Sequence, residues 1–234
     1  MAKVDIELQD TGESGTLYES RFEVMTNTTR RLTIAAIVFG GLISANAQDR
    51  MPPIAPDKMT DAQKKAVADY KQLRGADLTG PPWSVILRVP DLVVPSLEMR
   101  LHNQKNSALT PKLTEFAILI AARQWTNNYE WSAHATAAER AGLSKPIIAA
   151  VADGRRPDGM AEDEAIVYDF CIEVLHNQSV SDPTYARMLA KFGEPGIVEA
   201  ASLEGYYTYL SMIMNTARSP LNPGAKPALA PFPK

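Results

Sequence analysis

Residues 110–142 decide the fold, and they read Thr110-Pro-Lys-Leu-Thr-Glu115-Phe-Ala-Ile-Leu-Ile-Ala-Ala-Arg123-Gln-Trp-Thr-Asn-Asn-Tyr-Glu130-Trp-Ser-Ala-His134-Ala-Thr-Ala-Ala-Glu-Arg-Ala-Gly142. Their pattern predicts two helices joined by a short Asn-Asn turn. The first helix should begin after Thr110, whose hydroxyl can cap free backbone N–H groups. Pro111 then takes the first helical position, where its missing N–H costs nothing. The apolar residues that follow share one face of this helix: Leu113, Phe116, Ala117 and Ile120.

The second helix of the pair has its own start and stop signals. Asn127 is the expected cap, and Glu130 follows three residues later, as in a capping box. Gly142 marks the end of the helix. Since Glu130 and His134 are four residues apart, they lie on the same helix face.

Four polar residues interrupt the apolar pattern of these two helices: Glu115, Arg123, Glu130 and His134. A charged group in such surroundings must be paired or functional. Plainer explanations exist for each. Glu130 could serve only as a cap, His134 could simply pair with Glu130, and Glu115 could form a buried ion pair with Arg123 two turns further along the helix.

The rest of the chain also carries helix signals, and no run of alternating residues is long enough to indicate a sheet. We expect helices from Thr60 to Gly75, from Pro90-Asp91 to about Asn103, after Ser144, over about 161–176, from Ser181 to Gly193, and from about Gly196 to Ala217. The predicted fold class is therefore all-α. Closely spaced prolines from Pro220 onward predict an extended tail over 220–234.

The first 47 residues have the pattern of a targeting segment. Arg30-Arg31 precedes an apolar run that ends in Ala45-Asn-Ala47, an A-x-A cleavage signal. The run is shorter than the ~20 residues that a membrane-spanning helix needs. Met25 is a plausible true start, because the residues before it are too acidic for an export signal. We expect cleavage after Ala47, a helical domain over 48–219, a periplasmic or secreted protein, and no membrane attachment after cleavage.

Charge and cysteine content exclude several function classes. Basic and acidic residues nearly balance over 48–234, so nothing indicates binding to nucleic acid. Cys171 is the only cysteine, which excludes disulfide chemistry within one chain. Three scattered histidines give no recognisable metal site, and we expect none. Cys171 and His176 are expected to be structural.

The central residues resemble the carboxymuconolactone decarboxylase family, whose helical fold is shared with the alkyl hydroperoxidase D-type proteins. The resemblance covers roughly Thr60 to Pro223, and its most specific part is Tyr129-Glu-Trp-Ser-Ala-His134. Glu115 and His134 match the glutamate and histidine of the peroxidase active site. Asn127 and Glu130 occupy the two cysteine positions of that site, so peroxidase and disulfide reductase chemistry is disfavoured. The resemblance implies the decarboxylase branch, an obligate trimer or hexamer, and no cofactor.

The residues are chemically compatible with decarboxylation of a carboxylated lactone. The enzyme needs a cation that binds the substrate carboxylates. Loss of CO₂ leaves a dienolate, so it also needs a hydrogen-bond donor that stabilises the oxyanion and an acid that protonates carbon. Arg123 offers a bidentate fork for a carboxylate, and His134 is the natural acid. Glu115 and Glu130 could orient the imidazole. Candidate substrate-binding or donor residues by chemistry alone are Trp83, His102, Tyr206 and Asn215.

We therefore expect a carboxy-lyase-like enzyme that acts by acid–base chemistry on a small carboxylated lactone or related substrate. Export weakens the assignment of carboxymuconolactone itself as the substrate, because the breakdown of aromatic compounds through carboxymuconolactone is intracellular. Two alternatives remain open at this point: a cofactor-free isomerase or hydrolase that uses the same residues, and a non-catalytic periplasmic binding or assembly module.

Overall fold

The computed structural model describes residues 49–105 and 107–231. Every regular element in these two ranges is a helix, which confirms the predicted all-α class. The predicted signal segment, residues 1–47, lies outside the described residues. Among the helices that are described, none combines the length and the apolar character needed to cross a membrane.

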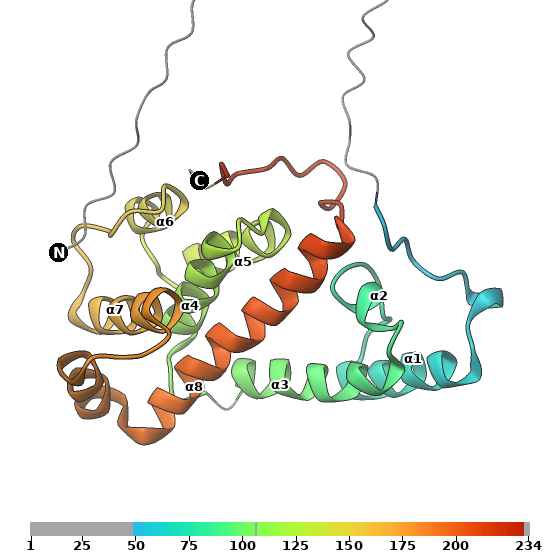
Figure 1. Ribbon diagram of the computed structural model, residues 1–234, viewed down its shortest axis with the longest axis horizontal. Helices are drawn as coiled ribbons and strands as arrows, with labels where there is room; N and C mark the ends of the chain where they lie inside the picture. Colours follow the sequence, from blue (N-terminus) through green and yellow to red (C-terminus); the bar gives the residue numbers. More distant parts are fainter. Residues whose placement is uncertain (1–48, 106, 232–234) are drawn as a thin grey trace, which may run out of the picture. The chain divides into compact units, whose positions relative to one another are not determined.

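The first part of the described chain forms three α-helices and two short 3-10 helices. In order they are η1 (Pro56–Lys58), α1 (Asp61–Arg74), α2 (Trp83–Ile86), η2 (Pro90–Leu92) and α3 (Val93–Lys105). The predicted capping box at the start of α1 is present, because Thr60 and Gln63 exchange hydrogen bonds between side chain and backbone. The helix ends at Gly75 in the left-handed conformation. Contacts among α1, η2 and α3 join these three elements into one layer, whereas α2 contacts α8 (Figure 1).

The central helix is α4 (Pro111–Gln124), which lies among α5, α6, α7 and α8 (Figure 1). Thr110 caps it as predicted, with its Oγ1 accepting a hydrogen bond from the Leu113 N–H at 3.4 Å. Every residue from Leu113 to Arg123 is buried except Glu115. A helix that is apolar on nearly all sides belongs in the interior, and α4 forms the middle of the core.

Three helices follow α4: α5 (Asn128–Arg140), α6 (Lys145–Ala152) and α7 (Glu162–Asn177). The turn between α4 and α5 is tight. Thr126 adopts a positive φ of 47°, and the Asn127 N–H donates to the carbonyl of Ala122 at 2.8 Å. The Asn127 side chain caps α5 by accepting from the Glu130 N–H at 3.0 Å, as expected. This turn fixes α5 directly against α4.

The last helix, α8 (Asp182–Ala217), consists of two helical pieces joined at a kink. Gly193 has φ 66° and ψ −179°, a conformation that is essentially restricted to glycine. The predicted break at Gly193 is therefore confirmed. The helix packs against α4 and α7, and its longer second piece carries tyrosines into the interior.

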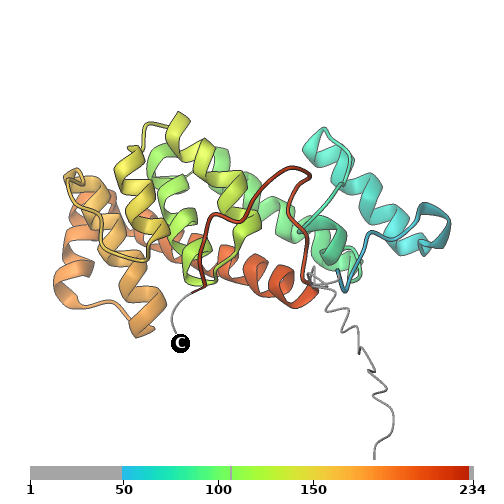
Figure 2. The same cartoon turned by 90° about the horizontal axis from the view of Figure 1, so that it is seen from above.

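After α8, residues 218–231 contain no helix and return across α5 (Figure 2). Asn128 holds this tail, because its Oδ1 accepts from the Ala228 and Leu229 N–H groups, both at 2.8 Å. The Leu229 side chain is buried in the core. The tail thus packs on its own chain at the junction of α4 and α5.

Candidate active site

Glu115 and His134 meet between α4 and α5. Nδ1 of His134 lies 2.7 Å from Oε2 of Glu115, although the residues belong to different helices. The capped turn at Asn127 produces this meeting, because it starts α5 beside the end of α4 and lets α5 run back along it. The buried pattern of α4 leaves Glu115 as its one partly exposed residue between Leu113 and Arg123.

Glu130 contacts the other side of the same imidazole ring. Its Oε2 lies 3.3 Å from Nε2 of His134, one helical turn along α5. The capping interpretation fails for this carboxylate, because the Asn127 N–H that it would accept from is bonded to the Ala122 carbonyl. The Glu130 side chain is only 5% exposed, against 18% for Glu115. His134 is therefore held between two carboxylates, one from each helix.

The two carboxylates determine the charge of His134. Burial lowers the pKa of the imidazole, but the hydrogen bonds and negative charges of Glu115 and Glu130 outweigh burial and raise the pKa to about 9. The ring is then an imidazolium at neutral pH. In this state it is a proton donor.

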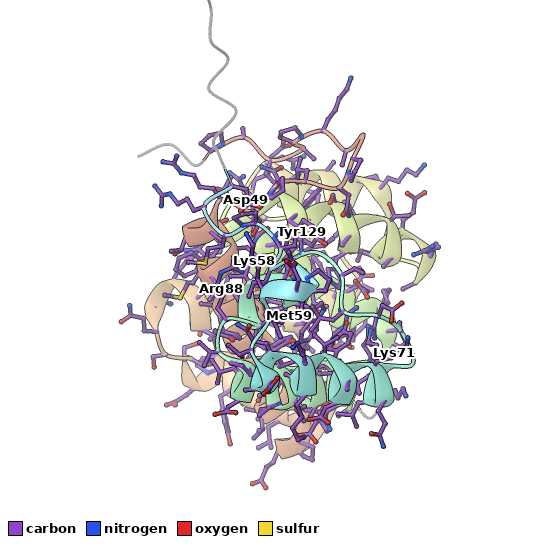
Figure 3. All side chains as sticks on the ribbon, turned by 90° about the vertical axis from the view of Figure 1, so that its right-hand side faces the viewer. Asp49, Lys58, Met59, Lys71, Arg88 and Tyr129 are labelled. Atoms are coloured by element: carbon purple, nitrogen blue, oxygen red, sulfur yellow. The ribbon has the colours of Figure 1, made fainter. Side chains whose placement is uncertain are left out.

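His134 and Glu130 line a pocket of about 300 Å³, here called pocket 1. One wall comes from α5 and α8, and the other comes from α1, the 76–82 loop, α2 and α3. Pocket 1 is lined by Tyr70, Arg74, Ala76, Asp77, Thr79, Pro81, Pro82, Trp83, Arg100, Tyr129, Glu130, Ala133, His134, Tyr207 and Leu210. Figure 3 looks onto α1, with Tyr129 near the middle of the view and Lys71 at the right-hand edge of the molecule. The predicted substrate-binding residue Trp83 lines the same pocket as His134.

A second pocket of about 310 Å³, pocket 2, lies on the Glu115 side. It is formed by the end of α3, the loop after it and the start of α4. Tyr207 lines both pockets, and its ring meets the imidazole of His134 edge-on at 5.2 Å. Burial raises the pKa of Tyr207 well above its usual value, so the phenol remains a hydrogen-bond donor.

Arg123 does not join the other three predicted residues. Its Nη1 donates to the carbonyl of Ala230 in the tail, and its side chain lines a different pocket with Gln124 and His176. The expectation that Glu115, Arg123, Glu130 and His134 share one pocket is therefore wrong, because Glu115 lines pocket 2 and not pocket 1, and Arg123 lines neither of them. The reason is the direction in which the arginine leaves α4, toward the tail and not toward α5.

His102 also lies apart from the site. It is half-exposed, and its Nε2 lies 3.2 Å from Glu199. The same Glu199 carboxylate accepts from the Ser107 hydroxyl at 2.9 Å and from the Ala108 N–H. His102 therefore helps to fasten the loop between α3 and α4 to α8, and it lines neither pocket.

Two further donor candidates are engaged elsewhere. The Tyr206 hydroxyl donates to the Ser96 carbonyl at 2.9 Å, and the Asn215 amide donates to the Trp125 carbonyl at 2.8 Å. Tyr206 is buried and structural, whereas its neighbour Tyr207 faces the pockets.

Sequence reasoning missed three residues of pocket 1 that bear on its chemistry. From the sequence, Tyr207 in its apolar helix is predicted to be a core or subunit-interface residue, and nothing singles out Arg74 or Arg100. Tyr207 lies within two residues of Tyr206 and Tyr209 in an apolar helix, and arginines on helices are common at any surface. No local signal separates these residues from their neighbours.

Within the described residues, no group of three or more histidines, cysteines or acids is arranged to hold a metal ion. Cys171 is fully buried, and burial, together with Glu204, raises the pKa of its thiol well above the usual value. The thiol is inert in this state.

No model of a known protein family matches the chain, and no curated protein matches it either. The resemblance to the carboxymuconolactone decarboxylases therefore rests on the residues quoted above and on the fold class.

Proposed function

We propose that the chain is a carboxymuconolactone decarboxylase-like enzyme that uses cofactor-free acid–base chemistry on a small carboxylated lactone or a related substrate bound in pocket 1. The observation that supports the proposal most strongly is the position of His134. Its ring is held between Glu115 and Glu130 at the wall of a pocket large enough for such a ligand. The proposal includes the finer fold type, an alkyl hydroperoxidase D-like domain that assembles into trimers or hexamers, and export to the periplasm.

The reaction needs an acid that still carries its proton when CO₂ leaves. When the carboxylate departs as CO₂, its electron pair moves into the unsaturated ring and gives a dienolate. The imidazolium of His134 then transfers its proton to carbon and becomes neutral. Because its pKa is raised to about 9, His134 carries this proton at neutral pH. One proton from solvent restores the imidazolium after each turnover.

Tyr207 is the group best placed to stabilise the oxyanion. Its phenol lines pocket 1 beside His134 and stays protonated. A positioned acid contributes roughly 10²–10⁴-fold to a rate, and one fixed oxyanion donor contributes roughly 10²–10³-fold.

The test is turnover by the purified protein on carboxymuconolactone and a panel of unsaturated lactones. We expect His134→Ala to lower kcat by about 10²–10⁴-fold on any substrate that is turned over. His176→Ala is the matched control, because this surface histidine on α7 bonds to Gln124 away from pocket 1. Equal rates for wild type and His134→Ala would remove the proposed site. If no lactone is turned over, a non-catalytic binding module becomes the better interpretation.

A further inference from the structure

The charges in pocket 1 do not balance. Its two acidic groups have partners, since Asp77 pairs with Lys71 at 2.8 Å and Glu130 pairs with His134. Its two arginines, Arg74 and Arg100, form no ion pair with any described residue. Pocket 1 therefore has excess positive charge and is suited to an anionic ligand.

Arg100 is the arginine of pocket 1 whose charge acts on Tyr207, the tyrosine in contact with His134. It extends from α3, is partly buried, and its Nε is buried without a hydrogen-bond partner in the described chain. Its positive charge acts on the phenols of Tyr129, Tyr206 and Tyr207, where it opposes the effect of burial on their pKa values. Two of these tyrosines line pocket 1, and Tyr207 touches the His134 ring. The guanidinium group is thus held among the residues that surround the acid.

A guanidinium that is partly removed from water and lacks a partner is costly, and a carboxylate offsets this cost through two parallel hydrogen bonds. The same wall of pocket 1 also carries aromatic rings, and those of Tyr70 and Trp83 have their centroids 5.0 Å apart. This wall fits the flat body of an unsaturated ring. The combination favours a planar carboxylate over a neutral ligand of the same shape.

We propose that Arg100 is the residue that binds a ligand carboxylate in pocket 1, with Arg74 adding positive charge, and that it takes the role expected of Arg123. A cation bound firmly to the departing carboxylate would stabilise charge that has to move into the ring, and this would oppose the reaction. Arg100 therefore binds a carboxylate that remains on the product. This last point rests on the proposed function, but the binding of a carboxylate does not.

The test is binding of 2-furoate, a planar unsaturated carboxylate, to the purified protein by isothermal titration calorimetry. Its neutral amide, 2-furamide, is the matched ligand. We expect 2-furoate to bind about 10- to 100-fold more tightly than 2-furamide, the range given by a hydrogen bond to a charged group. Arg100→Gln should abolish this preference, and Arg100→Lys should retain part of it.

Arg140→Gln is the control variant, because it removes the same charge from an exposed position on α5 outside pocket 1. It should leave both affinities unchanged, and circular dichroism should show that each variant is folded. If Arg100→Gln does not fold, the partial loss in Arg100→Lys decides the question. Absence of any preference for 2-furoate in wild type, or an unchanged preference in the folded Arg100 variant, would overturn the proposal.

The proposed function can fail separately. If the preference for 2-furoate depends on Arg100 but no lactone is turned over, the carboxylate site is supported and the proposed decarboxylase function is contradicted. If turnover depends on His134 but Arg100→Gln does not raise KM, the proposed enzyme function is supported and the role assigned to Arg100 is contradicted.

Discussion

Glu115 and His134 are nineteen residues apart in the chain and 2.7 Å apart in the structure, across the contact between α4 and α5. This contact does more than orient the ring. Together with Glu130 it keeps a buried imidazole charged, against the effect of burial. The strength of the acid therefore depends on residues from both helices.

Glu115→Gln tests this dependence directly. The variant keeps the size of the side chain but removes its negative charge, so the pKa of His134 should fall below about 9 toward the ordinary histidine range. NMR titration of the labelled histidine rings measures the midpoint. Glu98→Gln, an exposed acid on α3, is the control and should leave the titration unchanged. An unchanged midpoint in Glu115→Gln would show that Glu115 does not maintain the charge.

The ion pairs of His134 with Glu115 and Glu130 make the stability of the protein depend on pH. Because the pKa of His134 is higher in the folded protein than its ordinary value of 6.5, the stabilisation from its two ion pairs is fully present below about pH 6.5. It is lost as the pH rises through about 9.

The family resemblance predicted Glu115 and His134 in one site, and local signals fix the two helices that carry them. Thr110 and Asn127 set the starts of the two helices, and a short turn forces them to run side by side. Arg123 shows where such reasoning ends. It follows Glu115 by eight residues, which places the two about 80° apart around the helix axis. Since α4 is buried on nearly all sides, hydrophobic periodicity cannot tell which side faces α5 and which faces the tail.

Arg100 and Tyr207 show a second limit. Pocket 1 is lined by residues of α1, α2, α3, α5 and α8, so its members share no spacing in the sequence. Tyr206 and Tyr207 are neighbours, yet one bonds to a backbone carbonyl and the other lines both pockets. Their difference is set by tertiary packing and not by local pattern.

Arg123→Gln should affect the tail and not the ligand. Without the hydrogen bond from Arg123 to the Ala230 carbonyl, amide exchange in residues 226–231 should accelerate by about 10-fold or more, and Asn128→Ala should act in the same direction. Hydrogen-exchange mass spectrometry measures this change. The affinity for 2-furoate should stay at the wild-type value. If Arg123→Gln weakens 2-furoate as much as Arg100→Gln does, the roles of the two arginines are reversed.

Gly193 and Gly205 are two positions of α8 at which the same change to alanine should have opposite effects on stability. Gly193→Ala should destabilise the protein by about 1–3 kcal/mol, because its φ of 66° and ψ of −179° are unfavourable for any residue with a Cβ. Gly205 is helical and exposed, and an added Cβ would meet nothing within 4 Å. Gly205→Ala should therefore be neutral or stabilise by about 0.5–1 kcal/mol. Urea denaturation of both variants measures the two effects, and equal effects would show that the kink at Gly193 is not restrictive.

Glu204 predicts a second dependence of stability on pH. It is 1% exposed on α8, and burial raises its pKa from 4.5 to about 8, an effect that the neighbouring Cys171 thiol partly offsets. The folded state thus keeps a proton that the unfolded chain releases near pH 4.5. Between these two values Glu204 should make the free energy of unfolding fall by on the order of 1.4 kcal/mol for each pH unit.

Glu204→Gln isolates this contribution, because the amide has nearly the same shape and does not titrate. We expect wild type and variant to have similar stability near pH 4.5, and the variant to become progressively more stable than wild type up to about pH 8. His134 contributes equally to both proteins, so it cancels in the difference. Urea denaturation at pH 5, 6, 7 and 8 measures this difference, with Glu98→Gln as an exposed control. A difference that does not grow with pH would mean that Glu204 is ionised in the folded protein, with a compensating donor beside it.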